Sequence, residues 1–228
     1  MFSKVFLAMT AAEVMDATAE QIAYMALHFS PYSAGLSNPP PKLPKNNILL
    51  LDDSTPPANH DPNLVAEQLK YFMDRHSAQA LVLDFQKEIS EASLKMAEHI
   101  LSALPCTIAI TKAYASRFQC PVFLSPTPVN KSLTQHLSPW LKQGIFLEIA
   151  PEAVQFTVTE TGTTVTNVPT GHILPLSNKK LHCHYKADTD SHQVVFTLER
   201  TREDLSALTE DAYRLGVQGV IGLYQELK

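Results

Sequence analysis

The residues best placed to do chemistry follow one short apolar segment. Residues 79–86 read Gln-Ala-Leu-Val-Leu-Asp-Phe-Gln, which predicts a buried strand that delivers a carboxylate, Asp84, and then an amide, Gln86, to its exposed carboxyl end. A carboxylate can bind a polar ligand or exchange a proton, whereas the amide of Gln86 has no proton to give up at neutral pH. The segment therefore indicates a pocket more firmly than it indicates a reaction.

The elements that would position these residues alternate along most of the chain. Short apolar segments are followed by amphipathic helices, which is typical of parallel βα units. Helices are predicted over 62–76, where Asp61 is a good N-cap, over about 90–104 and over about 203–214. Eight parallel strands are predicted, at 22–29, 47–52, 80–85, 107–110, 122–124, 145–149, 193–198 and 217–222.

Eight strands is the number that a closed α/β barrel needs, and such barrels often form from a chain of this length. The main alternative is an open doubly wound sheet, which usually carries a glycine-rich phosphate loop after its first strand. The chain has only 7 glycines and no GxGxxG motif. We therefore predict a single α/β domain over residues 1–228, an irregular (β/α)8 TIM-like barrel with several short or missing helices.

Two strand pairs interrupt the βα pattern. Thr and Val alternate over 154–159 and 164–166 on either side of a glycine turn, which predicts a β-hairpin. Residues 182–185 and 193–198 also read as a strand pair, joined by a turn at 188–191. The barrel is therefore expected to carry a β-hairpin insertion.

In a barrel, the residues at the carboxyl ends of the strands line the active face. The polar residues expected there are His28, Asp52, Asp53, Asp84, Gln86, Lys112, Tyr114, Glu148, Glu199, Arg200 and Tyr224. A carboxylate-rich rim with aromatic neighbours suits a polar ligand with many hydroxyl groups. The plainer interpretation of any one of these residues is that strand ends are polar because they meet water.

Residues 79–86 also resemble the strand signature of the chitinase-like glycoside hydrolases, Asp-Gly-hydrophobic-Asp-hydrophobic-Asp-aromatic-Glu. Asp84 and Phe85 stand at the last Asp and the aromatic position, and the departures are Gln79, Ala80, Val82 and Gln86. The resemblance implies retaining hydrolysis, in which the terminal Glu protonates the leaving oxygen and the preceding Asp orients the substrate's own N-acetyl group as nucleophile. Gln86 occupies the position of that acid.

The resemblance therefore implies a carbohydrate-binding protein or a degenerate glycosidase. The candidate catalytic residues are Asp84, Gln86 and Glu148, where Glu148 could replace the lost acid. Asp84 would hold a polar group of the ligand and Gln86 would hydrogen-bond to it. The residues expected to complete the ligand site are His28, Asp52, Asp53, Lys112, Tyr114 and Tyr224.

Two other functions stay open. A barrel enzyme of unrelated chemistry, of the lyase or aldolase type, could use Lys112 as a base or Schiff-base lysine with Asp52 or Asp84 as its partner. A non-enzymatic interaction protein could instead pair its Thr- and Val-rich hairpins, at 154–166 and 181–198, with a second copy of the chain. A homo-oligomer is therefore a possible assembly.

Metal binding is not the favoured interpretation of the polar clusters. Asp52 and Asp53 could join His60 as ligands, but the turn before Pro56 and the helix that follows explain them better. Two histidines, at 182 and 184, are expected on one face of a strand as a surface pair, because no third ligand stands at a recognisable spacing. No metal and no cofactor are expected.

Composition limits the partners and the compartment. The net charge of −5 argues against nucleic acid, which requires concentrated Lys and Arg. No apolar run approaches the ~20 residues of a membrane span, and the apolar stretch Val5–Met9 is too short for a secretory signal, so the start of the chain is read as part of the fold. The three cysteines form no CxxC pair, which suits reduced thiols in a cytoplasmic protein.

Overall fold

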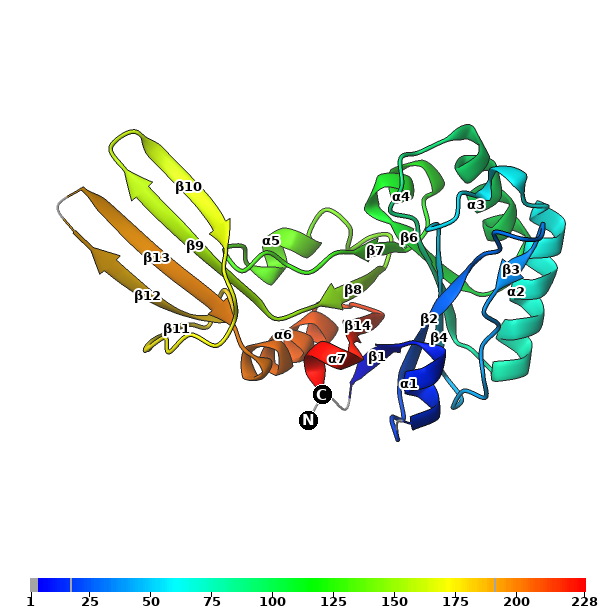
Figure 1. Ribbon diagram of the computed structural model, residues 1–228, viewed down its shortest axis with the longest axis horizontal. Helices are drawn as coiled ribbons and strands as arrows, with labels where there is room; N and C mark the ends of the chain where they lie inside the picture. The colour runs from blue at the N-terminus through cyan, green and yellow to red at the C-terminus, as the bar shows by residue number, and fades with distance from the viewer. Residues whose placement is uncertain (1–3, 17, 191) are drawn as a thin grey trace.

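The computed structural model describes residues 4–16, 18–190 and 192–228, and its largest element is a closed barrel of parallel strands (Figure 1). The strand order β1-β14-β8-β7-β6-β5-β4-β2 is closed by the parallel pairing of β1 with β2. The eight strands are β1 (Val5–Met9), β2 (Ile22–Phe29), β4 (Ile48–Asp52), β5 (Ala80–Asp84), β6 (Thr107–Thr111), β7 (Val122–Leu124), β8 (Ile145–Ile149) and β14 (Gly219–Leu223). The predicted TIM-like barrel is confirmed.

One member of the predicted strand set was wrong. Residues 193–198 belong to β13 (Gln193–Arg200), which pairs antiparallel with its neighbours outside the barrel. The eighth strand of the barrel is β1, which was not among the predicted strands. β13 carries three consecutive apolar residues, at 194–196, so its sequence alone did not separate it from a barrel strand. β1 is continuously apolar, as a strand covered on both faces must be, but it has only five residues.

Inward side chains fill the barrel, as expected for a packed core. Large and small residues are mixed in this layer: Phe6, Ala8, Ala23, Ile48, Leu50, Ala80, Val82, Ala109, Phe123, Phe146 and Ile221. Gly219 is required by this packing, since a Cβ atom there would lie 2.8 Å from the Phe146 ring. The interior can therefore admit a ligand only at an end of the barrel.

Helices pack on the outside of the strands. The long ones are α2 (Pro62–His76), α3 (Glu91–Ala103) and α6 (Arg202–Arg214), close to the predicted ranges. The side chain of Asp61 accepts a hydrogen bond from the backbone N–H of Asn63 at 2.9 Å and so caps α2 as predicted. The shorter helices are α1 (Ala11–Asp16), η1 (Pro57–Asn59), α4 (Lys112–Phe118), α5 (Leu133–Leu137) and α7 (Tyr224–Leu227). Within the described residues, none of the helices has the length and apolarity needed to cross a membrane.

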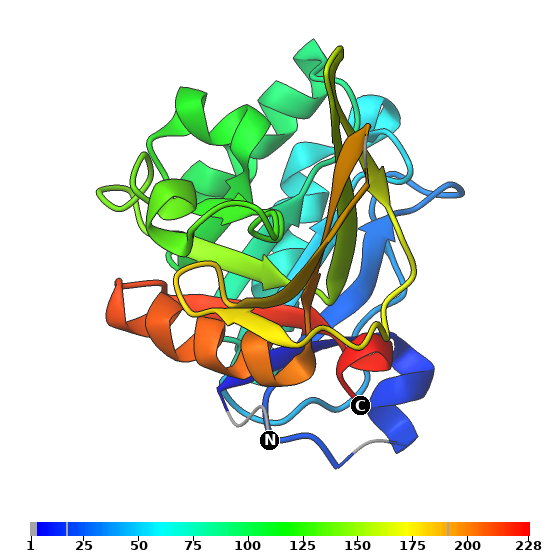
Figure 2. The same cartoon turned by 90° about the vertical axis from the view of Figure 1, so that its left-hand side faces the viewer.

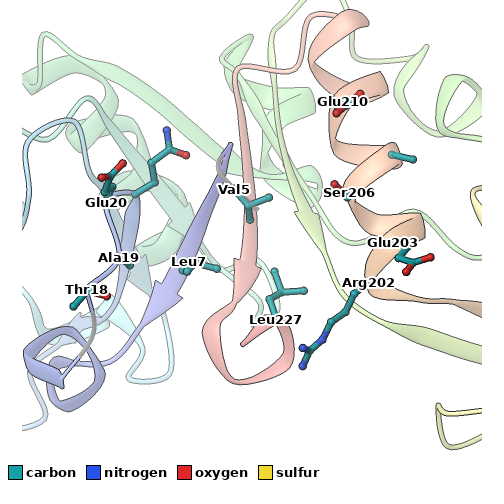
Figure 3. A pocket seen from close by; sticks show the side chains of 12 residues that line it. Val5, Leu7, Thr18, Ala19, Glu20, Arg202, Glu203, Ser206, Glu210 and Leu227 are labelled. Atoms are coloured by element: carbon teal, nitrogen blue, oxygen red, sulfur yellow. The ribbon is translucent and has the colours of Figure 1, made fainter. Parts of the chain in front are cut away.

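Helices cover the outside of the barrel unevenly. The helix that follows β1, α1, has six residues and buries none of its side chains. A groove of about 970 Å³ remains between residues 18–21 and α6, and Val5 and Leu7 of β1 face it (Figure 3). Since Val5 and Leu7 alternate with inward residues of the same strand, this groove lies outside the barrel and not at its mouth.

A second sheet stands apart from the barrel, to its left in Figure 1, and Figure 2 shows it from that side. It is antiparallel, with the order β10-β9-β13-β12-β11, and it lies between β8 and α6 in the chain. Its other strands are β9 (Glu152–Thr159), β10 (Gly162–Asn167), β11 (Leu176–Asn178) and β12 (Cys183–Thr189). The predicted hairpins thus join into one five-stranded sheet. A short strand, β3 (Leu36–Ser37), pairs antiparallel with β2. Residue 191 of the predicted turn lies outside the described residues.

A buried arginine joins this sheet to the barrel. Arg200 is 1% exposed, and its Nε and Nη2 atoms donate to the carbonyl oxygens of His182 (3.1 Å) and Leu181 (2.9 Å). Its Nη1 atom donates to the carbonyl oxygen of Thr127, in the loop after β7. Glu199 is also buried here, and its carboxylate accepts hydrogen bonds from the backbone N–H groups of Gly171 and His172. The prediction that Glu199 and Arg200 lie on the barrel rim was wrong, because β13 is not a barrel strand.

Candidate functional site

A small cavity opens among the carboxyl ends of the barrel strands. It measures about 170 Å³ and is lined by Ala8, Met25, Leu50, Asp52, Asp84, Phe123, Glu148, Ile221, Gly222 and Leu223. The three acidic residues end or nearly end three different strands, β4, β5 and β8. The fold therefore gathers three carboxylates from distant parts of the sequence over an apolar floor.

Asp84 and Gln86 interact directly. Asp84 is the last residue of β5, level with Asp52 on β4, and its Oδ1 atom accepts a hydrogen bond from Nε2 of Gln86 at 2.5 Å. Burial raises the pKa of the Asp84 carboxyl, the bond from Gln86 lowers it, and the charges of Asp52 and Asp53 raise it. Asp84 therefore faces the cavity while it orients the exposed amide of Gln86.

Glu148 is the most perturbed carboxyl of the cavity. Burial raises its pKa to about 7, and the negative charges of Asp84 and Glu226 act in the same direction. A carboxyl with this pKa is protonated in a large fraction of molecules near neutral pH, so it can donate a hydrogen bond or a proton. The two predicted acidic residues, Asp84 and Glu148, thus meet at one cavity.

The two neighbouring aspartates have different surroundings. Asp52 lines the cavity, and its Oδ1 atom accepts the backbone N–H of Ser54 at 2.7 Å. Asp53 is buried and accepts the backbone N–H groups of Gln86 at 2.8 Å and Lys87 at 3.1 Å. The Asp53 carboxylate therefore fixes the chain where it leaves β5, and its predicted role in ligand binding stays a prediction.

Tyr114 is also misplaced by the sequence prediction. It lies in α4 and not at a strand end, it is 0% exposed, and its hydroxyl group donates to Oγ of Ser93 in α3 at 2.9 Å. Its ring meets Phe85 edge-on, with the ring centroids 5.6 Å apart. Tyr114 therefore packs in the helical layer behind the strand and does not line the cavity.

The remaining predicted ligand residues do not line the cavity. His28 is half-buried at the end of β2, level with Asp52, and its Nδ1 atom lies 3.2 Å from the carbonyl oxygen of Ala26. Lys112 is exposed at the start of α4, and Tyr224 is half-buried at the start of α7. Their roles stay predictions for a ligand that extends beyond the cavity.

The apolar part of the site was not predicted from the sequence. Met25, Phe123 and Leu223 line the cavity together with the carboxylates. Alternation along each barrel strand was the available signal, since inward residues two positions apart share a face. The signal was weak because β7 has only three residues and the register of β2 shifts between Tyr24 and Leu27.

The paired histidines have structural partners. Nε2 of His182 lies 3.3 Å from Asp211, and Nδ1 of His184 lies 2.9 Å from Asp204, so both contact α6. Within the described residues, no group of three or more His, Cys, Asp or Glu side chains is arranged to hold a metal ion. These histidines therefore attach the second sheet to α6.

No protein-family model and no curated protein matches the chain. Among solved structures, the spore cortex-lytic enzyme SleL of Bacillus cereus is similar over 99% of this chain and 72% of its own, with 10% identity and a TM-score of 0.57. SleL of Bacillus megaterium QM B1551 is similar over 96% and 70%, with 8% identity and a TM-score of 0.52.

A third similar structure is the glycoside hydrolase family 18 N-acetylglucosaminidase of Paenibacillus barengoltzii. The similarity covers 98% of this chain and 97% of that enzyme, with 10% identity and a TM-score of 0.55. Likeness at this level of identity concerns the fold. The chain therefore shares the barrel fold of these enzymes, which is the fold that the resemblance at residues 79–86 implied.

Proposed function

We propose that this protein binds N-acetylated sugars at the mouth of its barrel and hydrolyses them slowly or not at all. One observation carries the proposal. Asp84 faces the cavity, and its Oδ1 atom accepts a hydrogen bond from the amide of Gln86 at 2.5 Å. The fold shared with an N-acetylglucosaminidase supports this ligand class. The sugar would thus bind at the end of β5, where the chitinase-like signature has an Asp followed by a catalytic Glu. In this chain Asp84 is kept and Gln86 replaces the Glu.

The size of the cavity supports partial entry of the ligand. At about 170 Å³ it is smaller than the ~300–1,000 Å³ of most small-molecule sites. A group the size of an acetamido substituent fits, and the sugar ring would remain in the mouth. Inside, the acetamido N–H could donate to a carboxylate, while the methyl group would rest on apolar residues such as Phe123.

Hydrolysis is expected to be weak because of the amide at position 86. A positioned general acid typically contributes ~10²–10⁴-fold to the rate, and Gln86 cannot supply that proton. Glu148 is the remaining candidate, since it lines the same cavity with a pKa of about 7. Residual hydrolysis, if measured, would therefore depend on Glu148.

The test is to restore the acid. Gln86→Glu should raise the hydrolysis of 4-nitrophenyl N-acetyl-β-glucosaminide by about 10²-fold over the wild type, because the new carboxyl replaces an amide of the same shape beside Asp84. The matched control is Gln86→Glu combined with Asp84→Asn, which should lose the gain. The proposal is wrong if Gln86→Glu gains nothing and neither protein binds a sugar on a glycan array.

The two other predicted functions have less support. Lys112 is exposed at the start of α4 and does not line the cavity with Asp52 and Asp84, so a lysine-dependent reaction there is not favoured. The second sheet carries exposed apolar residues, Val158 and Val165 among them, which is compatible with self-association. Self-association and a cytoplasmic location both stay predictions.

A further inference from the structure

One edge of the second sheet is open to another strand. The outermost strands of this sheet are β10 and β11, and Figure 1 shows β10 along one side of it. All six residues of β10 are exposed, and the strand faces β9 over six uninterrupted residue pairs. In an antiparallel pair, alternate residues direct their backbone N–H and C=O groups away from the partner strand. The outer side of β10 therefore presents backbone groups to which a further strand could hydrogen-bond.

The two edges of the sheet differ in their protection. Folded proteins usually protect an edge with charged side chains, with proline or with a very short strand. β11 has only three residues, with Pro175 before it and Lys179 and Lys180 after it. β10 reads Gly-Thr-Thr-Val-Thr-Asn, without a charged residue or a proline. The contrast within one sheet indicates that β10 is the edge at which a strand can be added.

A row of apolar side chains crosses the sheet and ends at this edge. Val165 of β10 lies opposite Phe156 of β9, and Phe156 lies opposite Phe196 of β13, so the three side chains share one face. Val165 is 58% exposed and Phe196 is 36% exposed. A strand that pairs with β10 would place a side chain beside Val165 and remove apolar surface from water.

The strand that fits this edge best is β10 of a second copy. In an antiparallel pair centred on Val165, this residue would meet its own counterpart, and Thr164 would meet Thr166 of the other copy. Apolar residues thus meet apolar ones and threonines meet threonines, which are favourable cross-strand pairs. The acidic residue of the turn before β10, Glu160, would lie about ten residues along the strands from its counterpart, or roughly 30 Å. This separation exceeds the Debye length of ~8–10 Å, so like charges do not meet at the contact.

We propose that two copies of this chain associate through β10 and join their five-stranded sheets into one continuous antiparallel sheet. The interface is isologous, with a two-fold axis normal to the sheet at Val165. An axis in this direction keeps the apolar rows of both copies on the same face, where each continues the other. The inference goes beyond the proposed function, because it involves neither a sugar nor the barrel mouth.

The experiment compares substitutions at the edge and inside the sheet. Sedimentation equilibrium of the full chain over a wide range of concentration measures the dimer dissociation constant of the wild type, Val165→Lys, Val165→Ile and Val158→Lys. Val165→Lys should weaken the dimer about 10-fold, because two ammonium groups would lie opposite each other at the two-fold axis. Val165→Ile keeps an apolar, β-branched side chain and should dimerise like the wild type.

Val158→Lys is the matched control. Val158 is 38% exposed and lies on the same face as Val165, but it belongs to β9, one strand in from the edge. The two copies of this residue would be separated by both β10 strands, so the new charge should leave the dimer unchanged. Hydrogen exchange gives a second measurement: amide groups of β10 should exchange more slowly as the concentration of the wild type rises, and those of Val165→Lys should not.

Three results would overturn the proposal. The first is a wild type that stays monomeric at every concentration. The second is a Val165→Lys variant that dimerises as tightly as the wild type. The third is a Val158→Lys variant weakened as strongly as Val165→Lys, which would mean that the copies meet through the face of the sheet and not through its edge. Circular dichroism would verify that each variant is folded.

Discussion

Charged side chains are buried at two places in this molecule, and their surroundings differ. At the junction between the second sheet and the barrel, Arg200 donates to three backbone carbonyl groups, and Glu152 lies 4.0 Å from its Nη1 atom. At the barrel mouth, Asp84 and Glu148 share a small cavity with a third carboxylate. Within the part of the chain that the structure describes, neither of these two residues has a cationic side chain within ion-pair distance.

The difference separates a structural role from a binding role. A buried guanidinium whose three nitrogen atoms each donate a hydrogen bond stabilises the fold, and removing it leaves its partners without a donor. Carboxylates that share a half-buried cavity raise each other's pKa, and their repulsion destabilises the protein without ligand. Such an arrangement is common where a ligand supplies the missing partner. We therefore expect substitutions at the two places to change stability in opposite directions.

The largest expected loss of stability is at the junction. Arg200→Met should lower the free energy of unfolding by about 3–5 kcal/mol, because the Leu181, His182 and Thr127 carbonyl groups lose their donor and Glu152 loses its counter-charge. Urea denaturation followed by circular dichroism measures the change. Arg200→Lys, the matched control, keeps the charge and should lose less. A loss below about 1 kcal/mol for Arg200→Met would show that the junction does not depend on this residue.

At the cavity the expected effect has the opposite sign and depends on pH. The pKa of Glu148 is raised in the folded protein from 4.5 to about 7, so its contribution to stability is present below pH 4.5 and is lost as the pH rises through 7. Glu148→Gln resembles the protonated carboxyl. The variant should therefore match the wild type at pH 4 and exceed its free energy of unfolding by about 3 kcal/mol at pH 8.

Urea denaturation of both proteins at pH 4, 6 and 8 measures the Glu148→Gln difference. Asp61→Asn, which changes an exposed helix cap elsewhere, is a control for general effects of removing a carboxylate. A difference between Glu148→Gln and the wild type that is constant with pH would contradict the raised pKa.

The smallest effect is expected at Asp53, the buried carboxylate beside the cavity. Asp53 accepts two backbone N–H groups, those of Gln86 and Lys87, and Asp53→Asn should cost about 1–2 kcal/mol of stability, because a neutral amide oxygen accepts them less strongly. It should also weaken sugar binding, since Gln86 would lose its anchor. Urea denaturation measures the change in stability, and isothermal titration calorimetry with N-acetylglucosamine measures the change in binding. Unchanged binding with reduced stability would separate the anchor from the site.

Much of the fold was available from the sequence. Helix α2 begins and ends as predicted, because Asp61 caps it and apolar residues recur at helical spacing along one face. Seven of the eight barrel strands were predicted, because a short apolar run bounded by turn residues indicates a buried strand. The eighth was missed, since β1 is short and 193–198 resembles a strand equally well in either sheet.

Part of the site was also predictable. Asp84 and Glu148 end apolar strands, and parallel strands bring such ends to one edge. Asp53 and Tyr114 were expected on the rim and are buried instead, for a common reason. Polar or aromatic residues near a strand end can turn either toward the mouth or toward the neighbouring elements, and only packing partners such as Ser93 decide which.

The amino-acid sequence alone determined the barrel class, the approximate limits of the three long helices and the chemical nature of position 86, because propensity, periodicity and side-chain chemistry are local properties. Tertiary structure decided which strand closes the barrel, that Arg200 lies at a junction and not on the rim, and that Asp84, Glu148 and Asp52 share one cavity. Those outcomes depend on contacts between residues far apart in the chain, and local sequence pattern does not encode which distant partners meet.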